Sequence, residues 1–292
     1  MRVVLVCLNN YYDYILTNIT QLIRLGHKEI YLLTHSEFFH YFQEYNDNIK
    51  LIDVNLLEDT YNFLQTCNTD MNFRGGFWGL TSLRFFYIYA FMIKYQITDV
   101  IHLENDVLIY YNCDILNDNL DKNYLYIPFD SFSRNVASIM YIPNASVFKK
   151  VLDRYSPYES DMKNFVRIRE EIAIIQQFPI FCNEDSSEPE VAFVSSGFNK
   201  FEYIFDGAAI GQYVGGIDPR NNPDFYSVGV SPINNEDYHI GFVSSDCVIK
   251  YDKYGVFWRE VDGIKTPFTI VGNKEIPIFN LHIHSKKLYK YM

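Results

Sequence analysis

The first 33 residues alternate between apolar and amphipathic segments, and this order restricts the fold of the whole chain. Residues 3–7 form a continuous apolar run rich in β-branched side chains, which is typical of strands covered on both faces. An amphipathic stretch at 12–25 follows, Gly26 is placed to end a helix, and residues 29–33 are a second apolar run. This strand–helix–strand order predicts an α/β fold with a mostly parallel sheet.

The next segments extend the same pattern. The predicted strands cover residues 48–55, 99–103, 123–129 and 137–143, and the predicted helices cover residues 80–95, 144–155 and 159–178. Asn144 is placed to cap its helix, and residues 60–79 have the composition of a loop. In an α/β sheet of this kind, ligands bind beyond the carboxyl ends of the strands.

The last hundred residues change character. Short β-rich runs with turns predicted at 252–255 and 272–275 indicate hairpins, and therefore a β-rich C-terminal extension. There is no internal repeat and no low-complexity linker, so we predict a single domain over residues 1–292.

The composition limits which partners and which cellular compartment are expected for the protein. Lys and Arg number 25 against 36 Asp and Glu, and this net charge of −11 is opposite to that of most proteins that grip nucleic-acid phosphates. The five cysteines are far apart and never in C-x-x-C spacing, which indicates neither a disulfide framework nor a zinc site. No apolar run reaches about 18 residues. We expect a soluble cytoplasmic protein, bacterial or viral, without nucleic-acid partners.

Two carboxylates interrupt the apolar stretch "IHLENDVLIYY" at 101–111. Glu104 and Asp106 follow a predicted buried strand, where unpaired carboxylates would be costly to desolvate. A Glu-x-Asp pair at this edge can hold a divalent cation, which can in turn hold phosphate oxygens. The alternative is a solvated turn with Asn105 at its tip.

Arg84 lies within the predicted helix at 80–95. It is four positions after Leu80 and four before Ile88, so it sits on or beside the apolar stripe and needs an anionic partner there. The alternative is an arginine that reaches water or pairs with a structural carboxylate.

The C-terminal segment "FNLHIHSKKLYKYM" carries a second set of ligand-type side chains. If residues 279–284 form a strand, Asn280, His282 and His284 share one face, and Lys286 follows just past its end. One imidazole with two carboxylates suits manganese, and a nearby lysine can neutralise a diphosphate. H-x-H also opens the metal site of amidohydrolases, but those enzymes place it on an early strand.

The stretch "TSLRFFYIYAFMIKYQITDVIHLENDVLI" resembles the central signature of GT-A glycosyltransferases: a helix with an arginine, a strand, and a D-x-D motif whose first Asp is here Glu104. The layout is most similar to the glycogenin-type family and to uncharacterised bacterial and giant-virus enzymes. The resemblance implies a Rossmann-like GT-A fold, with a nucleotide-binding half at 1–110 and an acceptor half at 111–292 that ends in a metal- and phosphate-binding strand.

The resemblance also implies roles for particular residues. Asp106 and Glu104 would bind Mn²⁺ or Mg²⁺ with a late histidine, His282 first and His284 second, while Lys286 would bind phosphate. Arg84 would serve a nucleotide-sugar site, most simply one for a UDP-sugar. Asn9 and Asn10 stand where the nucleoside is received, and Asn135 stands where the donor sugar is lined; ordinary turns and caps explain these three equally well.

Two further carboxylates are candidate catalytic groups. Asp206 opens the glycine-rich segment at 205–223, where little side-chain bulk allows close approach of a ligand or another backbone; it could equally order the loop through an Asx turn. Asp218 lies in the same segment. Asp161 stands where the resembling family has an acidic residue at the start of a helix; a local cap explains it equally well.

These observations predict a metal-dependent glycosyltransferase that transfers a sugar from a nucleotide-diphosphate sugar to a hydroxyl of a glycan, lipid-linked or protein-linked acceptor. One alternative is a sugar-phosphate nucleotidyltransferase, although "CLNNYYDYILTN" lacks the Gly- and Arg/Lys-rich first loop of that class. The other is a non-catalytic nucleotide- or carbohydrate-binding protein.

Overall fold

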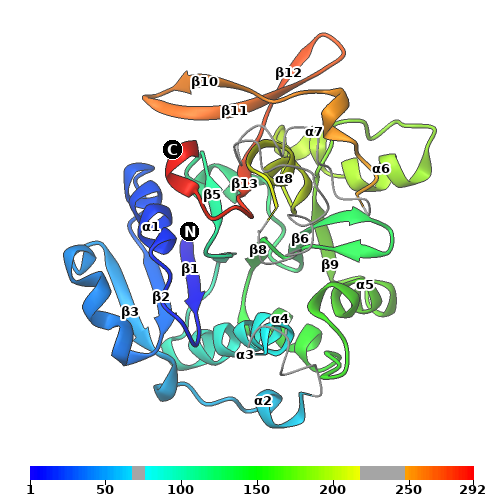
Figure 1. Ribbon diagram of the computed structural model, residues 1–292. Helices are drawn as coiled ribbons and strands as arrows, with labels where there is room; N and C mark the ends of the chain where they lie inside the picture. The colour runs from blue at the N-terminus through cyan, green and yellow to red at the C-terminus, as the bar shows by residue number, and fades with distance from the viewer. Residues whose placement is uncertain (68–75, 218–246) are drawn as a thin grey trace, which may run out of the picture.

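A mixed eight-stranded sheet forms the centre of the protein. The computed structural model describes residues 1–67, 76–217 and 247–292 (Figure 1). Across the sheet the order is β3-β2-β1-β4-β8-β6-β7, and β9 pairs with β6. The strands are β1 (Arg2–Cys7), β2 (Ile30–Thr34), β3 (Ile49–Asp53), β4 (Val100–Leu103), β6 (Leu125–Ser131), β7 (Arg134–Asn135), β8 (Ile139–Ile142) and β9 (Ile175–Phe178).

The N-terminal half of this sheet is parallel, as the first 33 residues predict. β1 pairs in parallel with β2 and with β4, and β2 with β3. β8 is antiparallel to both of its neighbours, and β9 is again parallel to β6. The carboxyl ends of β1, β4 and β6 therefore meet at one edge, and the predicted α/β fold class is confirmed.

Helices cover both faces of the sheet because successive side chains of a strand point to opposite faces. Val3 and Leu5 of β1 pack with Ile15 and Ile19 of α1, whereas Val4 packs with the helices of the opposite face. The helices are α1 (Tyr14–Arg24), α2 (Phe63–Thr66), α3 (Phe77–Tyr95), α4 (Ala145–Leu152), α5 (Asp161–Glu171), α6 (Pro189–Ser195), α7 (Phe198–Phe201) and α8 (Ala209–Gly215).

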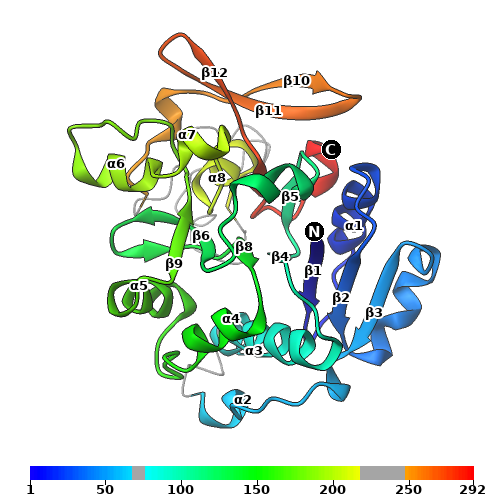
Figure 2. The same cartoon turned by 180° about the vertical axis from the view of Figure 1, so that it is seen from behind.

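The C-terminal part of the chain is rich in β-structure, as predicted. β10 (Phe257–Val261), β11 (Ile264–Val271) and β12 (Lys274–Pro277) form an antiparallel sheet, which lies at the top of both Figure 1 and Figure 2. The chain then returns: β13 (Asn280–His282) pairs antiparallel with β5 (Val107–Ile109), with His282 opposite Val107. The late histidine is thereby placed beside the acidic stretch. The short 3₁₀ helix η8 (Leu288–Tyr291) follows β13.

Four sequence predictions of local structure are wrong. The segment predicted as a loop at 60–79 contains α2 and the start of α3. The helix predicted at 159–178 ends at Glu171, and the apolar run after it forms β9 because it pairs with β6. The first hairpin turn is at Asp262 and Gly263, which adopt positive φ values of 50° and 76°, a conformation that Asp-Gly favours. The 252–255 segment instead contains the 3₁₀ helix η7 (Tyr251–Lys253). The strand predicted at 279–284 ends at His282.

No helix among the described residues has the length and apolar character needed to cross a membrane.

Candidate metal and nucleotide site

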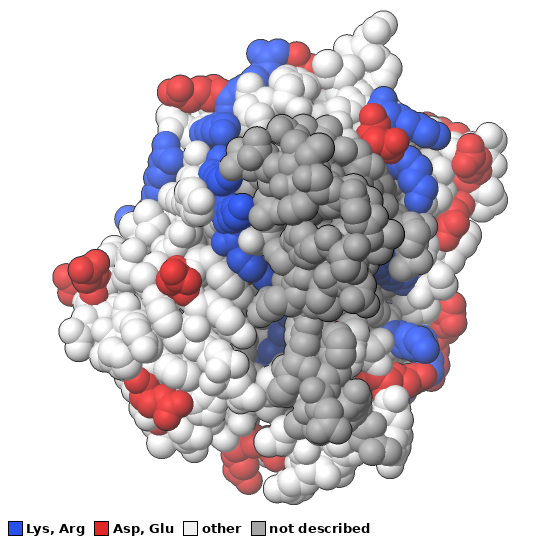
Figure 3. Space-filling view, viewed as in Figure 1, with Lys and Arg blue, Asp and Glu red and all other residues white. Residues whose placement is uncertain are grey.

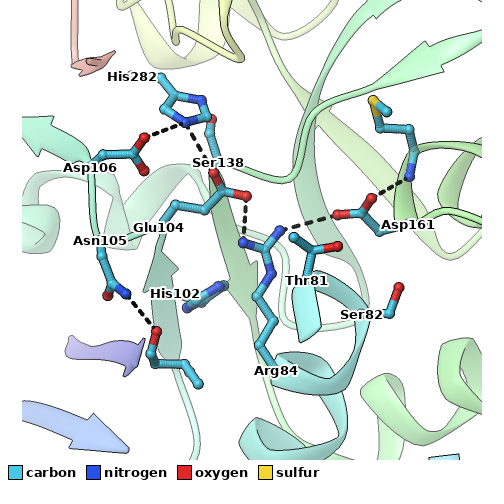
Figure 4. Close-up of polar contacts among 12 residues, drawn as sticks. Thr81, Ser82, Arg84, His102, Glu104, Asn105, Asp106, Ser138, Asp161 and His282 are labelled. Carbon is cyan, nitrogen blue, oxygen red and sulfur yellow. Dashed lines mark hydrogen bonds and ion pairs between the residues drawn. The ribbon is translucent and has the colours of Figure 1, made fainter. Parts of the chain in front are cut away.

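Two amide side chains, those of Asn105 and buried Asn18, hold the acidic stretch at the carboxyl end of β4. Asn105 Nδ2 donates to the Val6 carbonyl of the neighbouring β1 (2.8 Å), and its side chain turns away from the two carboxylates (Figure 4). Asn18 of α1 donates to the Asn105 carbonyl (3.1 Å) and to the Glu104 carbonyl (3.4 Å). Asn18 was not singled out from the sequence; a polar residue on the apolar face of an amphipathic helix is the signal that could have identified it.

Glu104, Asp106 and His282 converge on one point. Their ligand atoms all lie within 4.8 Å of one another, and His282 Nε2 is 3.0 Å from Glu104 Oε2 and 3.2 Å from Asp106 Oδ2 (Figure 4). His282 Nδ1 is 2.7 Å from the Gly207 carbonyl, to which it donates. Nε2 is thus the nitrogen that faces the carboxylates, which is the arrangement of a metal-ligating histidine oriented by a backbone carbonyl.

This group of atoms fits a hard divalent cation. Two carboxylates and one imidazole suit Mn²⁺ or Mg²⁺, and three ligands leave positions for water or phosphate oxygens in an octahedral shell. Asp106 and His282 are 5% and 4% exposed, so a cation here would act in a partly dehydrated environment.

Two cationic side chains flank the group. Lys286 Nζ donates to Asp106 Oδ2, and Arg84 donates to Glu104 Oε1 and, over 3.3 Å, to Asp161 Oδ2. Arg84 is therefore neither solvated nor without a partner: it joins the acidic stretch to the first residue of α5 (Figure 4). An arginine on the apolar stripe of α3 was expected to have an anionic partner, and Arg84 has two, Glu104 and Asp161.

The charges perturb one another strongly. Burial alone would raise the pKa of Asp106, but Lys286 and His282 outweigh it and hold this pKa well below its ordinary value. Burial also acts to raise the pKa of Glu104, and Arg84 with His282 reverses the effect, so this pKa is lowered. Burial would lower the pKa of His282, yet Asp106 and Glu104 raise it well above its ordinary value. In the metal-free protein, the proton on His282 Nε2 therefore takes the position that a bound metal ion would occupy.

His284 lies beside this group and is not a member of it. Its ring stacks on the His282 ring with centroids 4.0 Å apart, and its Nε2 is 3.4 Å from the Gln212 amide nitrogen. Burial lowers the pKa of His284 well below its ordinary value, and the neighbouring His282 and Lys286 lower it further. Ile283 N–H makes the last bond to the acidic stretch, at the Asp106 carbonyl, and the chain then turns: His284 N–H donates to the His282 carbonyl (3.1 Å). The geometry favours His282 as the third ligand.

The two candidate catalytic carboxylates are both engaged by other groups. Asp161 is buried and pairs with Arg84, and burial raises its pKa although Arg84 opposes this. Asp206 is 1% exposed and accepts backbone N–H groups on both oxygens, from Ile210, Gly211 and His282. Burial raises the pKa of Asp206 to about 6, and the N–H groups work against this. These bonds join Asp206 to the first turn of α8 and to β13, and its catalytic role stays a prediction.

Two of the three candidate asparagines are exposed, and the third lies inside the sheet. Asn9, at a φ of 66°, and Asn10 are exposed at the carboxyl end of β1. Asn135 is fully buried in β7, where its Nδ2 donates to the Pro128 carbonyl (2.9 Å). Their nucleotide and sugar contacts stay predictions. Asp218 lies outside the described residues.

Gly211 lies in the glycine-rich segment at 205–223, and the structure gives it a definite function in packing. A Cβ at this position would lie 2.0 Å from the His282 carbonyl oxygen and 2.9 Å from Asp206 Oδ2. Only the absence of a side chain lets α8 pack directly on the backbone of β13.

We expect Gly211→Ala to lower the free energy of unfolding by about 1–3 kcal/mol, since the methyl group meets backbone that cannot move aside. Urea denaturation would measure the change. Gly215→Ala is the matched control in the same helix: the nearest atoms to its Cβ would belong to the Tyr291 side chain, with the hydroxyl at 3.1 Å, and a side chain can shift where backbone cannot. Equal stability of the two variants would contradict the packing argument.

Among known proteins, the chain is similar to a set of solved structures. No protein-family model matches the sequence, and the comparison with curated proteins found no match. Mouse xyloside xylosyltransferase 1 is 10% identical with a TM-score of 0.43, over 68% of this chain and 93% of that one. The glycosyltransferase GlyE of Streptococcus pneumoniae is 20% identical with a TM-score of 0.38, over 63% of this chain and 46% of that one.

A cytidylyltransferase from Leptospira borgpetersenii is also similar, at 10% identity and a TM-score of 0.38, over 61% of this chain and 75% of that one. Glycosyltransferases, the class named by the sequence resemblance, recur among the similar structures, with nucleotidyltransferases beside them. We therefore base the functional proposal on the geometry of the site.

Proposed function

We propose that the protein is a metal-dependent glycosyltransferase that uses a nucleotide-diphosphate sugar, most simply a UDP-sugar, and a hydroxyl acceptor. The observation that carries this proposal is the convergence of Glu104, Asp106 and His282 at the carboxyl edge of the sheet. The adjacent Lys286 and Arg84 add positive charge on either side. Such a site suits a ligand that brings a diphosphate and a divalent cation together.

The side chains have separate tasks in the transfer. Asp106, Glu104 and His282 would hold Mn²⁺ or Mg²⁺, which supplies Lewis-acid stabilisation of the departing diphosphate. Lys286 would turn from Asp106 to a phosphate oxygen, because Asp106 then has the cation as its partner. Arg84 fixes Glu104 so that Oε2 faces the site. The bond from the anomeric carbon to the diphosphate would break, with its electron pair leaving on the diphosphate; a bond to the acceptor oxygen would form, and the acceptor proton would pass to solvent.

Positive charge is gathered on this side of an acidic protein. Lys286, Lys287 and Lys290 fall within the last seven residues, and Lys265 Nζ donates to the Lys290 carbonyl (3.4 Å). In Figure 3 a line of Lys and Arg side chains runs along the border of the grey residues. With a net charge of −11 for the whole chain, such a line favours the approach of an anionic donor at this face.

A donor screen tests the proposal. UDP-, GDP- and TDP-sugars are each incubated with the protein and Mn²⁺, and nucleotide release is measured with and without a chelator. We expect release from one donor family, lost on chelation. Pyrophosphate release from a nucleoside triphosphate and a sugar phosphate would identify a nucleotidyltransferase instead. A thermal shift with nucleotide and Mn²⁺ but no turnover would favour the binding protein, and no response to any donor or metal would refute the site.

Metal affinity should rise with pH. The raised pKa of His282 means that this ring carries a proton in the metal-free protein at neutral pH, and a cation must displace that proton. We expect the Mn²⁺ affinity to increase by up to about tenfold per pH unit between pH 6 and 8, measured as free Mn²⁺ by electron paramagnetic resonance. His284→Gln should keep the same slope, because the lowered pKa leaves His284 neutral throughout. A flat profile would contradict the assignment of His282 as ligand.

A further inference from the structure

Asp206 contacts the backbone of His282, the candidate metal ligand, and not the imidazole nitrogen that faces Glu104 and Asp106. Its Oδ2 accepts the backbone N–H of His282 (2.8 Å) and of Gly211 (2.7 Å), and its Oδ1 accepts the N–H of Ile210 (2.9 Å). Three of the about four lone-pair sites of this carboxylate are thus occupied by backbone donors. One of these donors belongs to the residue whose imidazole faces Glu104 and Asp106.

The backbone around Asp206 is tied to the same strand. Asn280 of β13 accepts the Asp206 N–H on Oδ1 (3.2 Å) and donates from Nδ2 to the Asp206 carbonyl (2.9 Å). Ser138 Oγ donates to that carbonyl as well (2.8 Å). The next residue, Gly207, supplies the carbonyl that accepts from His282 Nδ1 (2.7 Å). The position of β13 and the rotation of the His282 ring are therefore both set by residues 206 and 207.

The close packing of α8 against β13 leaves that strand little room to shift. Because Gly211 has no Cβ, α8 lies directly against the His282 carbonyl, and Asp206 bonds to the first turn of α8 and to His282 at once. A strand only three residues long has few ladder hydrogen bonds of its own, so these side-chain bonds supply much of its order.

We infer that Asp206 is a positioning residue for His282: its carboxylate joins β13 to α8 so that Nε2 of the imidazole meets the Glu104 and Asp106 carboxylates. This inference rests on the proposed function, since it assigns Asp206 to the support of the metal site and not to acceptor deprotonation. A general base must present a lone pair to the acceptor hydroxyl, whereas Asp206 is 1% exposed and turned toward backbone donors.

Asp206→Asn tests the inference in the full-length protein. The amide keeps the shape of the side chain but puts an NH₂ group against backbone N–H donors. We expect the Mn²⁺ affinity, measured without nucleotide by electron paramagnetic resonance, to fall about 10–100-fold. Hydrogen exchange of the 279–284 segment should accelerate. Saturating Mn²⁺ should restore kcat to within a few-fold, so that the loss appears in the metal requirement.

Asp99→Asn is the matched control, because Asp99 also pairs with neighbours, Tyr141 and Lys122, but lies at the amino end of β4. It should change neither the Mn²⁺ affinity nor the exchange of the 279–284 segment. If Asp206→Asn fails to fold, Ser138→Ala removes only the bond to the Asp206 carbonyl and should produce a smaller change of the same kind.

Two results would overturn the inference. One is an Asp206→Asn variant with unchanged Mn²⁺ affinity and unchanged exchange. The other is a kcat that saturating Mn²⁺ does not restore while the Mn²⁺ affinity is unchanged, which would make Asp206 a base. A wild-type protein that binds no Mn²⁺ would refute the proposed function instead, and the exchange comparison alone would then decide whether Asp206 orders β13.

Discussion

Replacing Asp106 with asparagine is expected to reduce Mn²⁺-dependent nucleotide release on the order of 1,000-fold. Asp106 is the carboxylate that faces both His282 and Lys286, so the change removes a ligand charge and the partner of the lysine at once. The amide has nearly the same shape but leaves Lys286 and the protonated His282 without their anionic partner, so the variant should also lose stability in the absence of metal. Turnover and metal affinity are therefore compared under conditions in which the variant is folded. Nucleotide release from the donor found by the screen is the measurement.

Asp118→Asn provides the control for this substitution. Asp118 is an exposed carboxylate in the 3₁₀ helix η4 (Cys113–Asn119), a few residues beyond β5, and the change of net charge is the same. It should leave nucleotide release unchanged. Retained activity of Asp106→Asn with the same metal requirement would mean that the acidic stretch does not hold the cation.

Replacing Arg84 with methionine is expected to lower the free energy of unfolding at pH 7 by about 3–5 kcal/mol. The Arg84 side chain is 10% exposed, and it pairs with the side chains of Glu104 (20% exposed) and Asp161 (9% exposed). Methionine fills a similar volume but leaves buried Asp161 without its cation and Glu104 with His282 alone. Chemical denaturation at pH 7 would measure the loss.

The loss should shrink as the pH falls. In the wild type, Arg84 helps to hold the pKa of Glu104 below its ordinary value, so the stability from this pair is present above the unfolded pKa and is lost only in strong acid. Burial already raises the pKa of Asp161, and without Arg84 it should rise further. The carboxyls of the variant then take up protons as the pH falls from 7 to 4, and their burial becomes less costly.

Arg167→Met is the matched control for Arg84. Arg167 also bonds to two carboxylates, Glu159 and Glu171, but its side chain is 33% exposed and theirs are 36% and 43% exposed. Solvent screens such pairs, so we expect a change below about 1 kcal/mol with little pH dependence. An Arg84 variant no less stable than the Arg167 variant would show that the buried network contributes nothing to folding.

Local sequence patterns predicted the parallel half of the sheet because its elements are long and periodic. The strand–helix–strand start, the helix around Arg84 and the strand before Glu104 are all present, and Asn144 caps its helix through a bond to Val147 N–H (2.9 Å). The predictions failed where contacts with distant parts of the chain override the local preference for helix or strand. The run after Glu171 has helix-compatible residues, yet pairing with β6 makes it a strand.

By itself, the sequence determined which chemistry the chain can offer: two carboxylates after a buried strand, an arginine on an apolar stripe, and a late histidine pair with a lysine. Tertiary structure alone decided how these groups are arranged. The return of β13 to β5 places His282, and not His284, against the carboxylates. It also turns Asp206 toward backbone N–H groups. Contacts between residues about 75 to 180 positions apart make these choices, and no local pattern encodes which of two neighbouring side chains will face a distant partner.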